Sequence, residues 1–248
     1  DKWFIAIKYE VEKPVVGANR PSVGVDIGIK ELAVCSNGKV FKNPKAYRRM
    51  SKRLKHLQRR LSKKKLGSSN RKKAVLLLAK LHARIANIRK DAIHKLTTYL
   101  AKNHSIIKIE DLLIKAFLKN HRLAGAIADC GMYEFKRQLE YKTEKFSSKL
   151  ILVERMFPSS QICSNCGNHR HRMPLKERVY NCPECGHIED RDLNASKNIE
   201  RWFEGIFIPV RSELTHQTVS STGIACGVDK PFNRQIEATL KQEVNTLD

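Results

Sequence analysis

The segment from Cys163 to Ala195 constrains the fold of this chain more than any other. It contains two Cys-x-x-Cys pairs and runs directly into a short acidic stretch. The pairs are Cys163 with Cys166 and Cys182 with Cys185. Thiolates at this spacing hold a tetrahedral Zn²⁺, and four of them close its coordination shell. The sequence therefore predicts a zinc ribbon over residues 158–189, with a structural zinc ion.

The other potential ligands near these cysteines have simpler interpretations. His169 and His171 lie between the pairs and are alternative zinc ligands, but with Arg170 and Arg172 we interpret them as a loop facing solvent or phosphate. The remaining three of the seven cysteines are scattered singly, and we interpret them as small buried residues. They are Cys35, Cys130 and Cys226. Paired cysteines of this kind indicate a reducing compartment and a metal site, not a disulfide framework.

The charge of the chain points to a polyanionic partner. It has 48 Lys and Arg against 25 Asp and Glu, a formal net charge of +23, and no acidic residue between Glu31 and Asp91. Neutralising phosphates and releasing their counterions would supply binding energy for such a surface. No segment approaches the roughly 20 apolar residues of a membrane span. We therefore predict nucleic acid as a partner, no membrane partner, and a cytoplasmic, nucleoid-associated location.

Periodicity predicts an α/β protein. Runs of apolar residues, or of alternating apolar and polar residues, predict strands, and apolar residues at helical spacing predict helices. Two of the strands are expected to be joined by a type I′ turn at Asn37-Gly38. The expected strands are 2–12, 23–27, 31–36, 39–41, 105–113 and 150–153. The expected helices are 44–66, 71–102, 133–149 and 193–203. The first two helices form a basic hairpin, with an apolar core that includes Leu54, Leu77 and Leu81.

Three acids stand in unusual places. Asp26 lies within an apolar strand, Glu110 ends another, and Asp192 follows the ribbon at the start of a helix. A carboxylate in a strand built for burial is costly unless it binds a metal or a donor. Three convergent carboxylates suit Mg²⁺ or Mn²⁺, and two such ions can drive in-line phosphodiester cleavage. We predict Asp26, Glu110 and Asp192 as catalytic metal ligands, with Asp190 as a second choice near Asp192.

Several motifs follow one another in an order typical of one family. They are VGVDIGIKELAV, NPKAYRRMSKRLKHLQRRLSKKKLGSSNRKKA, IIKIEDL, LKNHRLAGAIADCGMYEF, PSSQICSNCG, CPECG and EDRDLNASKNI. In these motifs the chain resembles the prokaryotic TnpB (OrfB) proteins of insertion sequences, which are relatives of the type V CRISPR nucleases and have long been called transposases. The resemblance implies an RNase H-like (RuvC) mixed sheet with an inserted basic helical hairpin and an inserted four-Cys zinc ribbon. It also implies RNA-guided cleavage of double-stranded DNA, with DNA and a guide RNA as partners.

The resemblance also divides the chain. Residues 1–21 would end a missing N-terminal region, 22–157 would form the RuvC-like core with the hairpin at 44–102, and 190–204 would carry the final acidic motif. Residues 205–248 would be a flexible tail. The chain begins inside an expected strand without Met, so we expect an N-terminally truncated member of the family.

Two other functions fit parts of the sequence. A catalytically decayed or truncated nucleic-acid-binding protein of a mobile element would need only the ribbon and the basic hairpin. A strand transferase would share the fold, but the sequence shows no convincing covalent nucleophile. Retention of all three acids favours the endonuclease over the binding protein, because binding alone does not require them. The sequence does not indicate an oligomeric state.

Overall fold

The computed structural model describes residues 5–10, 19–155, 157–171, 173–174, 176–203 and 206–207, all within one compact unit that spans residues 1–212. The elements in chain order are β1 (Ser22–Asp26), β2 (Glu31–Cys35), β3 (Val40–Lys42), α1 (Ala46–Ser62), α2 (Ser69–Asn103), β4 (Ile106–Glu110), α3 (Ile114–Lys119), α4 (Ala124–Cys130), α5 (Met132–Lys145), β5 (Lys149–Val153), β6 (Val179–Asn181), β7 (Ile188–Asp190), α6 (Arg191–Arg201), β8 (Trp202–Phe203) and β9 (Ile206–Phe207).

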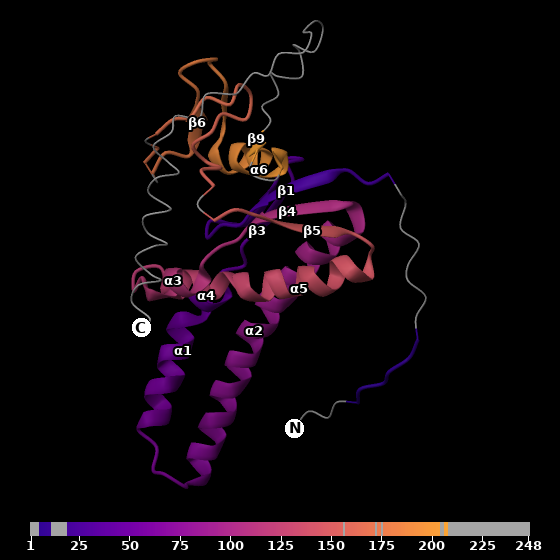
Figure 1. Ribbon diagram of the computed structural model, residues 1–248. Helices are drawn as coiled ribbons and strands as arrows, with labels where there is room; N and C mark the ends of the chain where they lie inside the picture. Colours follow the sequence, from indigo (N-terminus) through magenta and orange to yellow (C-terminus); the bar gives the residue numbers. More distant parts are fainter. Residues whose placement is uncertain are drawn as a thin grey trace, which may run out of the picture. The chain divides into compact units, whose positions relative to one another are not determined.

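A five-stranded mixed sheet forms the centre of this unit (Figure 1), with strand order β3-β2-β1-β4-β5. The strands β1, β2 and β3 pair antiparallel, and β4 runs parallel to both β1 and β5. Because β1 and β4 are parallel neighbours, their carboxyl ends lie side by side, with Val25 opposite Ile109. This arrangement confirms the predicted α/β class with a mixed sheet.

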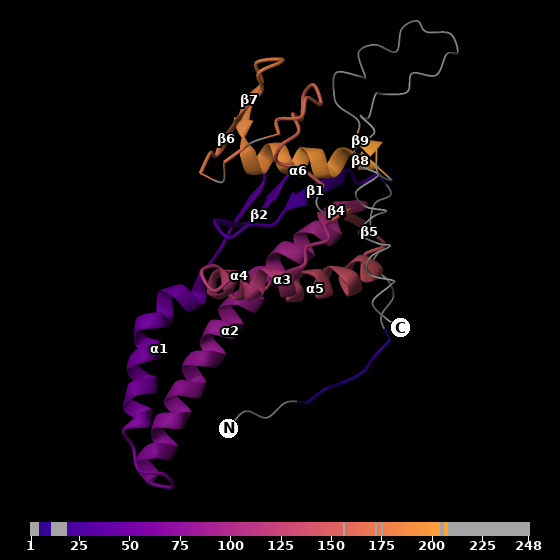
Figure 2. The ribbon, with the colours of Figure 1, turned by 60° about the vertical axis from the view of Figure 1, so that its left-hand side comes forward.

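Alternation along β1 and β4 assigns each residue to a face of the sheet. Val23, Val25, Ile107 and Ile109 belong to a buried cluster with side chains of α2 and α5, which cover one face. Helix α6 covers the opposite face, as Figure 2 shows. The intervening Lys108 donates from Nζ to the carbonyls of Glu200 and Trp202, the last turn of α6 and its cap, at 2.6 Å each. A cation is favourable at this end of a helix dipole.

Gly24 sets the distance between α6 and the sheet. A Cβ at this position would lie 2.1 Å from the carbonyl oxygen of Ser196 and 2.4 Å from the backbone nitrogen of Glu200. Both atoms belong to the backbone of α6, which cannot move aside as a side chain can. The glycine thus allows α6 to rest directly on β1, two residues before Asp26.

The helices α1 and α2 form the predicted basic hairpin. Their apolar contact joins Leu54 of α1 to Leu81 and Ile85 of α2, with Leu78 packed alongside. The predicted stripe placed Leu77 in this contact, and that was wrong, because Leu77 is half exposed and its neighbour Leu78 faces α1. No helix in the described part of the chain is long and apolar enough to cross a membrane.

The β2–β3 hairpin has a different turn from the one predicted. Gly38 has φ +82°, whereas Asn37 is not among the described residues with positive φ, so the turn is not type I′. Gly38 N donates to the carbonyl of Cys35, and Cys35 N donates to the carbonyl of Lys39, each at 2.9 Å. This is a three-residue connection with glycine in the left-handed position. The single glycine supplies the only positive φ that the turn requires.

Two expectations for the ends of the chain also need correction. Residues 5–10 form no strand, and Ile5, Ile7 and Tyr9 are exposed, because no strand in the described residues pairs with this segment. The expected tail began at residue 205, but 206–207 form β9, which pairs antiparallel with β8. The rest of the expected tail and of the expected strand 2–12 lies outside the described residues.

Candidate functional site

Asp26 and Glu110 are the last residues of adjacent parallel strands. Asp26 follows Gly24 by two positions and Glu110 follows Lys108 by two, so both carboxylates lie on the face that α6 covers. Ser159 donates from Oγ to Glu110 Oε1 at 2.5 Å. In VGVD and IIKIE, the valines and isoleucines alternate with the other residues. This alternation places the two acids on the same face of the sheet, at the same edge.

Asp192 approaches the same edge from the first turn of α6. The helix begins at Arg191, two residues earlier than expected, because Asp190 acts as its N-cap. Asp190 Oδ1 accepts hydrogen bonds from the backbone nitrogens of Asp192 at 2.9 Å and Leu193 at 3.2 Å. An N-cap aspartate satisfies donors that the helix leaves free. Asp190 thus fixes the turn that carries Asp192, while Asp192 keeps its own carboxylate for other partners.

The electrostatics of the site centre on Asp26. Its pKa is raised to about 8, first by burial and then by the negative charges of Glu110 and Asp192, while Arg191 acts in the opposite direction. Burial also raises the pKa of Glu110, and the hydrogen bond from Ser159 offsets part of this effect. Carboxyl groups that repel one another in a buried place favour a proton or a cation between them.

The three acids do not form a tight cluster. Among the described residues, only the four cysteines form a group of three or more potential ligands whose ligand atoms all lie within 4.8 Å of one another. At least one pair of oxygens among Asp26, Glu110 and Asp192 is therefore farther apart than that. The three side chains lie close enough for their charges to affect one another, but they do not surround a single point.

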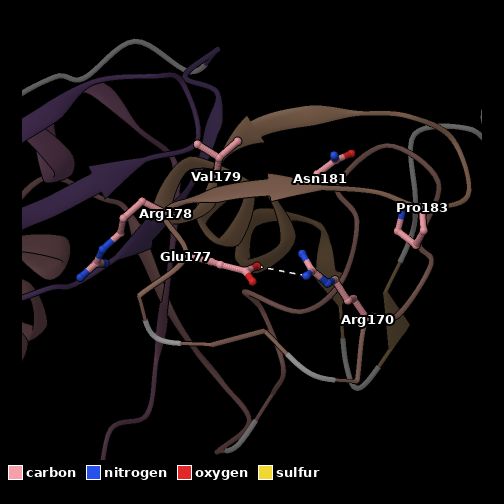
Figure 3. A pocket seen from close by; sticks show the side chains of 6 residues that line it. All are labelled: Arg170, Glu177, Arg178, Val179, Asn181 and Pro183. Carbon is pink, nitrogen blue, oxygen red and sulfur yellow. Dashed lines mark ion pairs between the residues drawn. The ribbon is translucent and has the colours of Figure 1, made fainter.

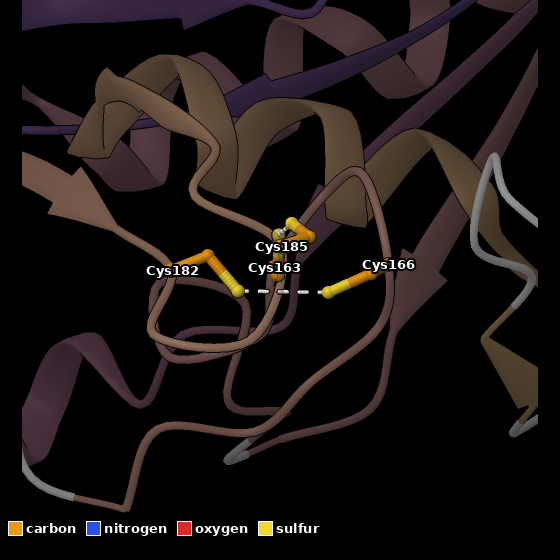
Figure 4. A group of neighbouring side chains, drawn as sticks. All are labelled: Cys163, Cys166, Cys182 and Cys185. Carbon is orange, nitrogen blue, oxygen red and sulfur yellow. Dashed lines mark hydrogen bonds between the residues drawn. The ribbon is translucent and has the colours of Figure 1, made fainter.

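The cysteines, in contrast, point toward one another, as Figure 4 shows. Cys163 Sγ lies 3.7 Å from Cys185 Sγ, and Cys166 Sγ lies 3.5 Å from Cys182 Sγ. Four sulfurs around Zn²⁺, each about 2.3 Å from the metal, would be about 3.8 Å apart, so the set fits a tetrahedral ion. The two knuckles repeat one geometry: Gly167 N donates to the Cys163 carbonyl and Gly186 N to the Cys182 carbonyl. The rings of His169 and His171 meet edge to face outside this group.

Two buried asparagines of α6 tie this cysteine-bearing segment to the acidic site. Asn194 accepts from Ser164 N at 2.9 Å and donates to the carbonyl of Ile162 at 2.7 Å. Asn198 donates to the carbonyls of Ser159 at 2.7 Å and Ile162 at 2.6 Å. Ser159 is thus bonded both to α6 and to Glu110. The sequence analysis missed these residues, although two asparagines four positions apart lie on the same face of a helix, which is a visible signal.

Two cavities lie near the site, and Arg178 lines both. The first, about 570 Å³, lies on the cysteine-bearing segment, where Arg170 and Glu177 form an ion pair at 3.1 Å (Figure 3). In this view Arg178 extends away from the other labelled side chains, toward the sheet. Its Nη1 lies 3.8 Å from Asp192 Oδ1. The second cavity, about 580 Å³, lies between the β1–β2 turn, the start of α1, and α4.

Comparison with known proteins identifies the family. Residues 6–121 match the OrfB_IS605 family, described as "Probable transposase", and residues 133–199 match the Cas12f1-like TNB domain. A protein of Streptomyces pristinaespiralis named "Putative RNA-guided DNA endonuclease" is 41% identical over 198 residues, which cover 80% of this chain and 49% of that protein. The chain belongs to the OrfB/TnpB family.

Other comparisons agree with this assignment. "Putative RNA-guided DNA endonuclease InsQ" of Escherichia coli (strain K12) is 35% identical over 214 residues, covering 80% of this chain and 53% of that protein. The cryo-EM structure of a Cas12f1-sgRNA-target DNA complex has the same fold over 72% of this chain and 49% of that chain, with a TM-score of 0.51 and 20% identity. This OrfB/TnpB chain spans about half the length of the curated relatives that it matches.

Proposed function

We propose that this OrfB/TnpB chain is the catalytic part of a divalent-metal-dependent DNA endonuclease that is guided by RNA. The observation that carries the proposal is the meeting of three carboxylates from separate elements at one sheet edge. Burial, together with the negative charges of Glu110 and Asp192, raises the pKa of Asp26 to about 8. A fold gains no stability from such an arrangement, whereas cations and phosphate oxygens would complete it.

The residues fit Mg²⁺ or Mn²⁺. Hard carboxylate oxygens are the ligands these ions prefer. Oxygens bound to one Mg²⁺ are at most about 4.2 Å apart, since each lies about 2.1 Å from the ion. The wider spread of Asp26, Glu110 and Asp192 therefore favours two ions or bridging water over one shared ion. When bound, such ions stabilise the attacking and leaving oxygens of an in-line phosphodiester cleavage.

Each residue has a separate part in this proposal. Asp26 lies in the fields of both other acids and would hold the ion between them. Ser159 orients the Glu110 carboxylate by its hydrogen bond, and Asp190 fixes the helix turn that carries Asp192. Arg178 pairs with Asp192 on the exposed side, where phosphate would enter.

The proposal extends to the fold, the zinc ion and the partners. The strand order and the acids at the ends of β1 and β4 support an RNase H-like (RuvC) core, and the four sulfurs support a zinc ribbon with a structural Zn²⁺. The acid-free stretch between Glu31 and Asp91, which includes α1 and most of α2, supports contacts with the nucleic-acid backbone. The names of the relatives and the Cas12f1 complex support DNA and guide RNA as those partners.

The test is cleavage of labelled DNA in Mg²⁺ or Mn²⁺, with and without guide RNA, by Asp26→Asn, Glu110→Gln and Asp192→Asn variants. We expect each to lose more activity than the 10–100-fold that removal of an indirect metal partner costs. Asp111→Asn is the matched control, because Asp111 adjoins Glu110 but pairs with Lys136 and Arg155.

Two results would contradict the proposal. Undiminished cleavage by Asp26→Asn would remove that residue from the site. Tight DNA binding without cleavage under any metal or guide condition would favour the non-catalytic nucleic-acid-binding protein instead.

A further inference from the structure

We propose that Lys108 is a positioning residue for the proposed cleavage, because it sets the distance between the carboxylates of Glu110 and Asp192. This role rests on the proposed function, in which those carboxylates hold divalent ions. Lys108 lies in the middle of β4, two residues before Glu110, and is only 8% exposed. Its ammonium group is buried against the last turn of α6, at the opposite end of that helix from Asp192.

Lys108 holds α6 by its backbone. The ammonium donates to the carbonyl oxygens of Glu200 and Trp202 at 2.6 Å each. Carbonyls at the end of a helix have no partner within the helix, so they must be bonded by other groups when they are buried. Because both acceptors belong to the main chain, the two bonds fix the position of α6 along its axis and its rotation about that axis.

Gly24 and Lys108 together form the seat of α6 on the sheet. They lie opposite each other in the parallel register of β1 and β4. Gly24 leaves room for the helix backbone at Ser196 and Glu200, and Lys108 bonds to the same part of the helix. Ser22 adds a hydrogen bond from Oγ to the Glu200 carboxylate at 2.7 Å. These bonds from the sheet reach α6 at its carboxyl end.

The position of this end of α6 determines the position of the other. A helix of 11 residues is about 16 Å long and moves as a stiff rod. Asp192 lies in its first turn, whereas Lys108 holds its last. Lys108 and Glu110 are two residues apart on one strand, or about 7 Å. The strand β4 therefore carries Glu110 directly and positions Asp192 through α6.

Packing alone does not explain a lysine at this place. Lysine is rarely buried, and burial lowers the pKa of Lys108, with the Glu200 carboxylate acting in the opposite direction. A valine or isoleucine would pack between sheet and helix without the cost of removing a charge from water. Neither could bond to the helix backbone. The bonds to α6 are what distinguish lysine from these residues.

The experiment compares the parent chain with Lys108→Met, both loaded with zinc. Methionine keeps a flexible side chain and removes the donors. Crystal structures without divalent ions measure the separation of the Glu110 and Asp192 carboxylates. Titration with Mn²⁺, followed by the electron paramagnetic resonance signal of the free ion, measures affinity, with Asp26→Asn as the background. We expect the separation to change and the affinity to fall about 10–100-fold, as on removal of an indirect metal partner.

A second buried lysine supplies the matched control. Lys142 is 6% exposed and lies on α5, which covers the opposite face of the sheet. It donates to Thr97 Oγ1 at 2.7 Å and to Thr98 Oγ1 at 2.8 Å. Lys142→Met should lower the unfolding temperature but leave the Mn²⁺ affinity and the carboxylate separation unchanged. Lys108→Gln keeps an amide donor, so it should show a smaller change than Lys108→Met and remains testable where Lys108→Met does not fold.

Two results would overturn the inference. One is an unchanged carboxylate separation in both Lys108 variants, and the other is an equal fall in Mn²⁺ affinity for Lys142→Met. Failure of the proposed nuclease looks different, because the parent would then bind no more Mn²⁺ than Asp26→Asn and would not cleave DNA. In that case the crystal structures would still show whether Lys108 sets the separation of the two acids.

Discussion

The pKa of Asp26 reflects the residues that surround it. Its folded-state pKa of about 8 lies above the ordinary value of 3.8, because burial and two nearby acids oppose its ionisation. Between these two values the unfolded chain releases this proton and the folded chain keeps it. Stability without divalent ions must therefore fall as the pH rises through this window and level off above about 8.

Replacement of Asp26 by asparagine should remove this pH dependence. The parent should lose up to about 1.4 kcal/mol per pH unit relative to Asp26→Asn between pH 4 and 8. Thermal unfolding of zinc-loaded protein without Mg²⁺ measures the difference. Added Mg²⁺ should stabilise the parent and leave the variant little changed. A constant gap between the two proteins at all pH values would show that Asp26 is ionised in the folded chain.

At the residue scale, the sequence shows which acids belong to the site, but it does not show which residues hold those acids in place. Asp26 and Glu110 stand out because each ends an apolar strand, a pattern visible within five residues. Ser159 and Asn198 stand out only after folding, because their partners lie 49 and 39 residues away along the chain.

Among the elements, α6 depends on close contact with β1. Gly24→Ala would place a methyl group 2.1 Å from a backbone oxygen of α6, so the helix must shift and carry Asp192 with it. We expect a loss of about 3 kcal/mol or more in unfolding free energy, together with loss of cleavage. Circular dichroism melting and the nuclease assay measure both. Gly125→Ala is the control, since nothing lies within 4 Å of its added Cβ, and it should not lower stability.

The four-cysteine segment should act on the acidic site through α6. Cys182→Ser should abolish zinc binding, expose this segment to proteolysis and reduce cleavage even in excess Mg²⁺. Cleavage should fall because α6 is held in place by the segment: Asn194 and Asn198 bond to the backbone of Ser159, Ile162 and Ser164. Zinc content, limited proteolysis and cleavage measure the three effects. Cys35→Ala, at a buried cysteine outside the cluster, should retain zinc. Full cleavage by a folded, zinc-free chain would show that the segment does not support Asp192.

Element boundaries were predictable where local chemistry decides them. The hairpin α1–α2 and the strands β1, β2, β4 and β5 follow from periodicity, and the break between the helices follows from Gly67 and the Ser68 cap. The turn type at Gly38 and the choice of Leu78 over Leu77 depend on how the strands and helices twist against each other. Residues 5–10 show the same limit, since an alternating pattern predicts a strand only where a partner is available.

For the whole molecule, charge placement matters more than its amount. The net charge of +23 would attract any polyanion, but the acid-free stretch concentrates cations on α1 and α2. On this hairpin Lys55, Lys80 and Arg84 are exposed and project from a helix pair whose own apolar contact is already satisfied. Such side chains add little to stability, so their change should alter binding alone.

Charge removal from the hairpin should therefore weaken DNA binding without unfolding the chain. The combined Lys55→Gln, Lys80→Gln and Arg84→Gln variant should reduce the salt slope for duplex DNA by up to about 2.7, or about 0.9 for each lost phosphate contact. A second variant, with the exposed Lys119, Lys145 and Lys149 changed to Gln, has the same net charge but leaves the hairpin intact. Equal losses in both variants would mean that total charge attracts DNA. A loss confined to the first would place the duplex on the hairpin.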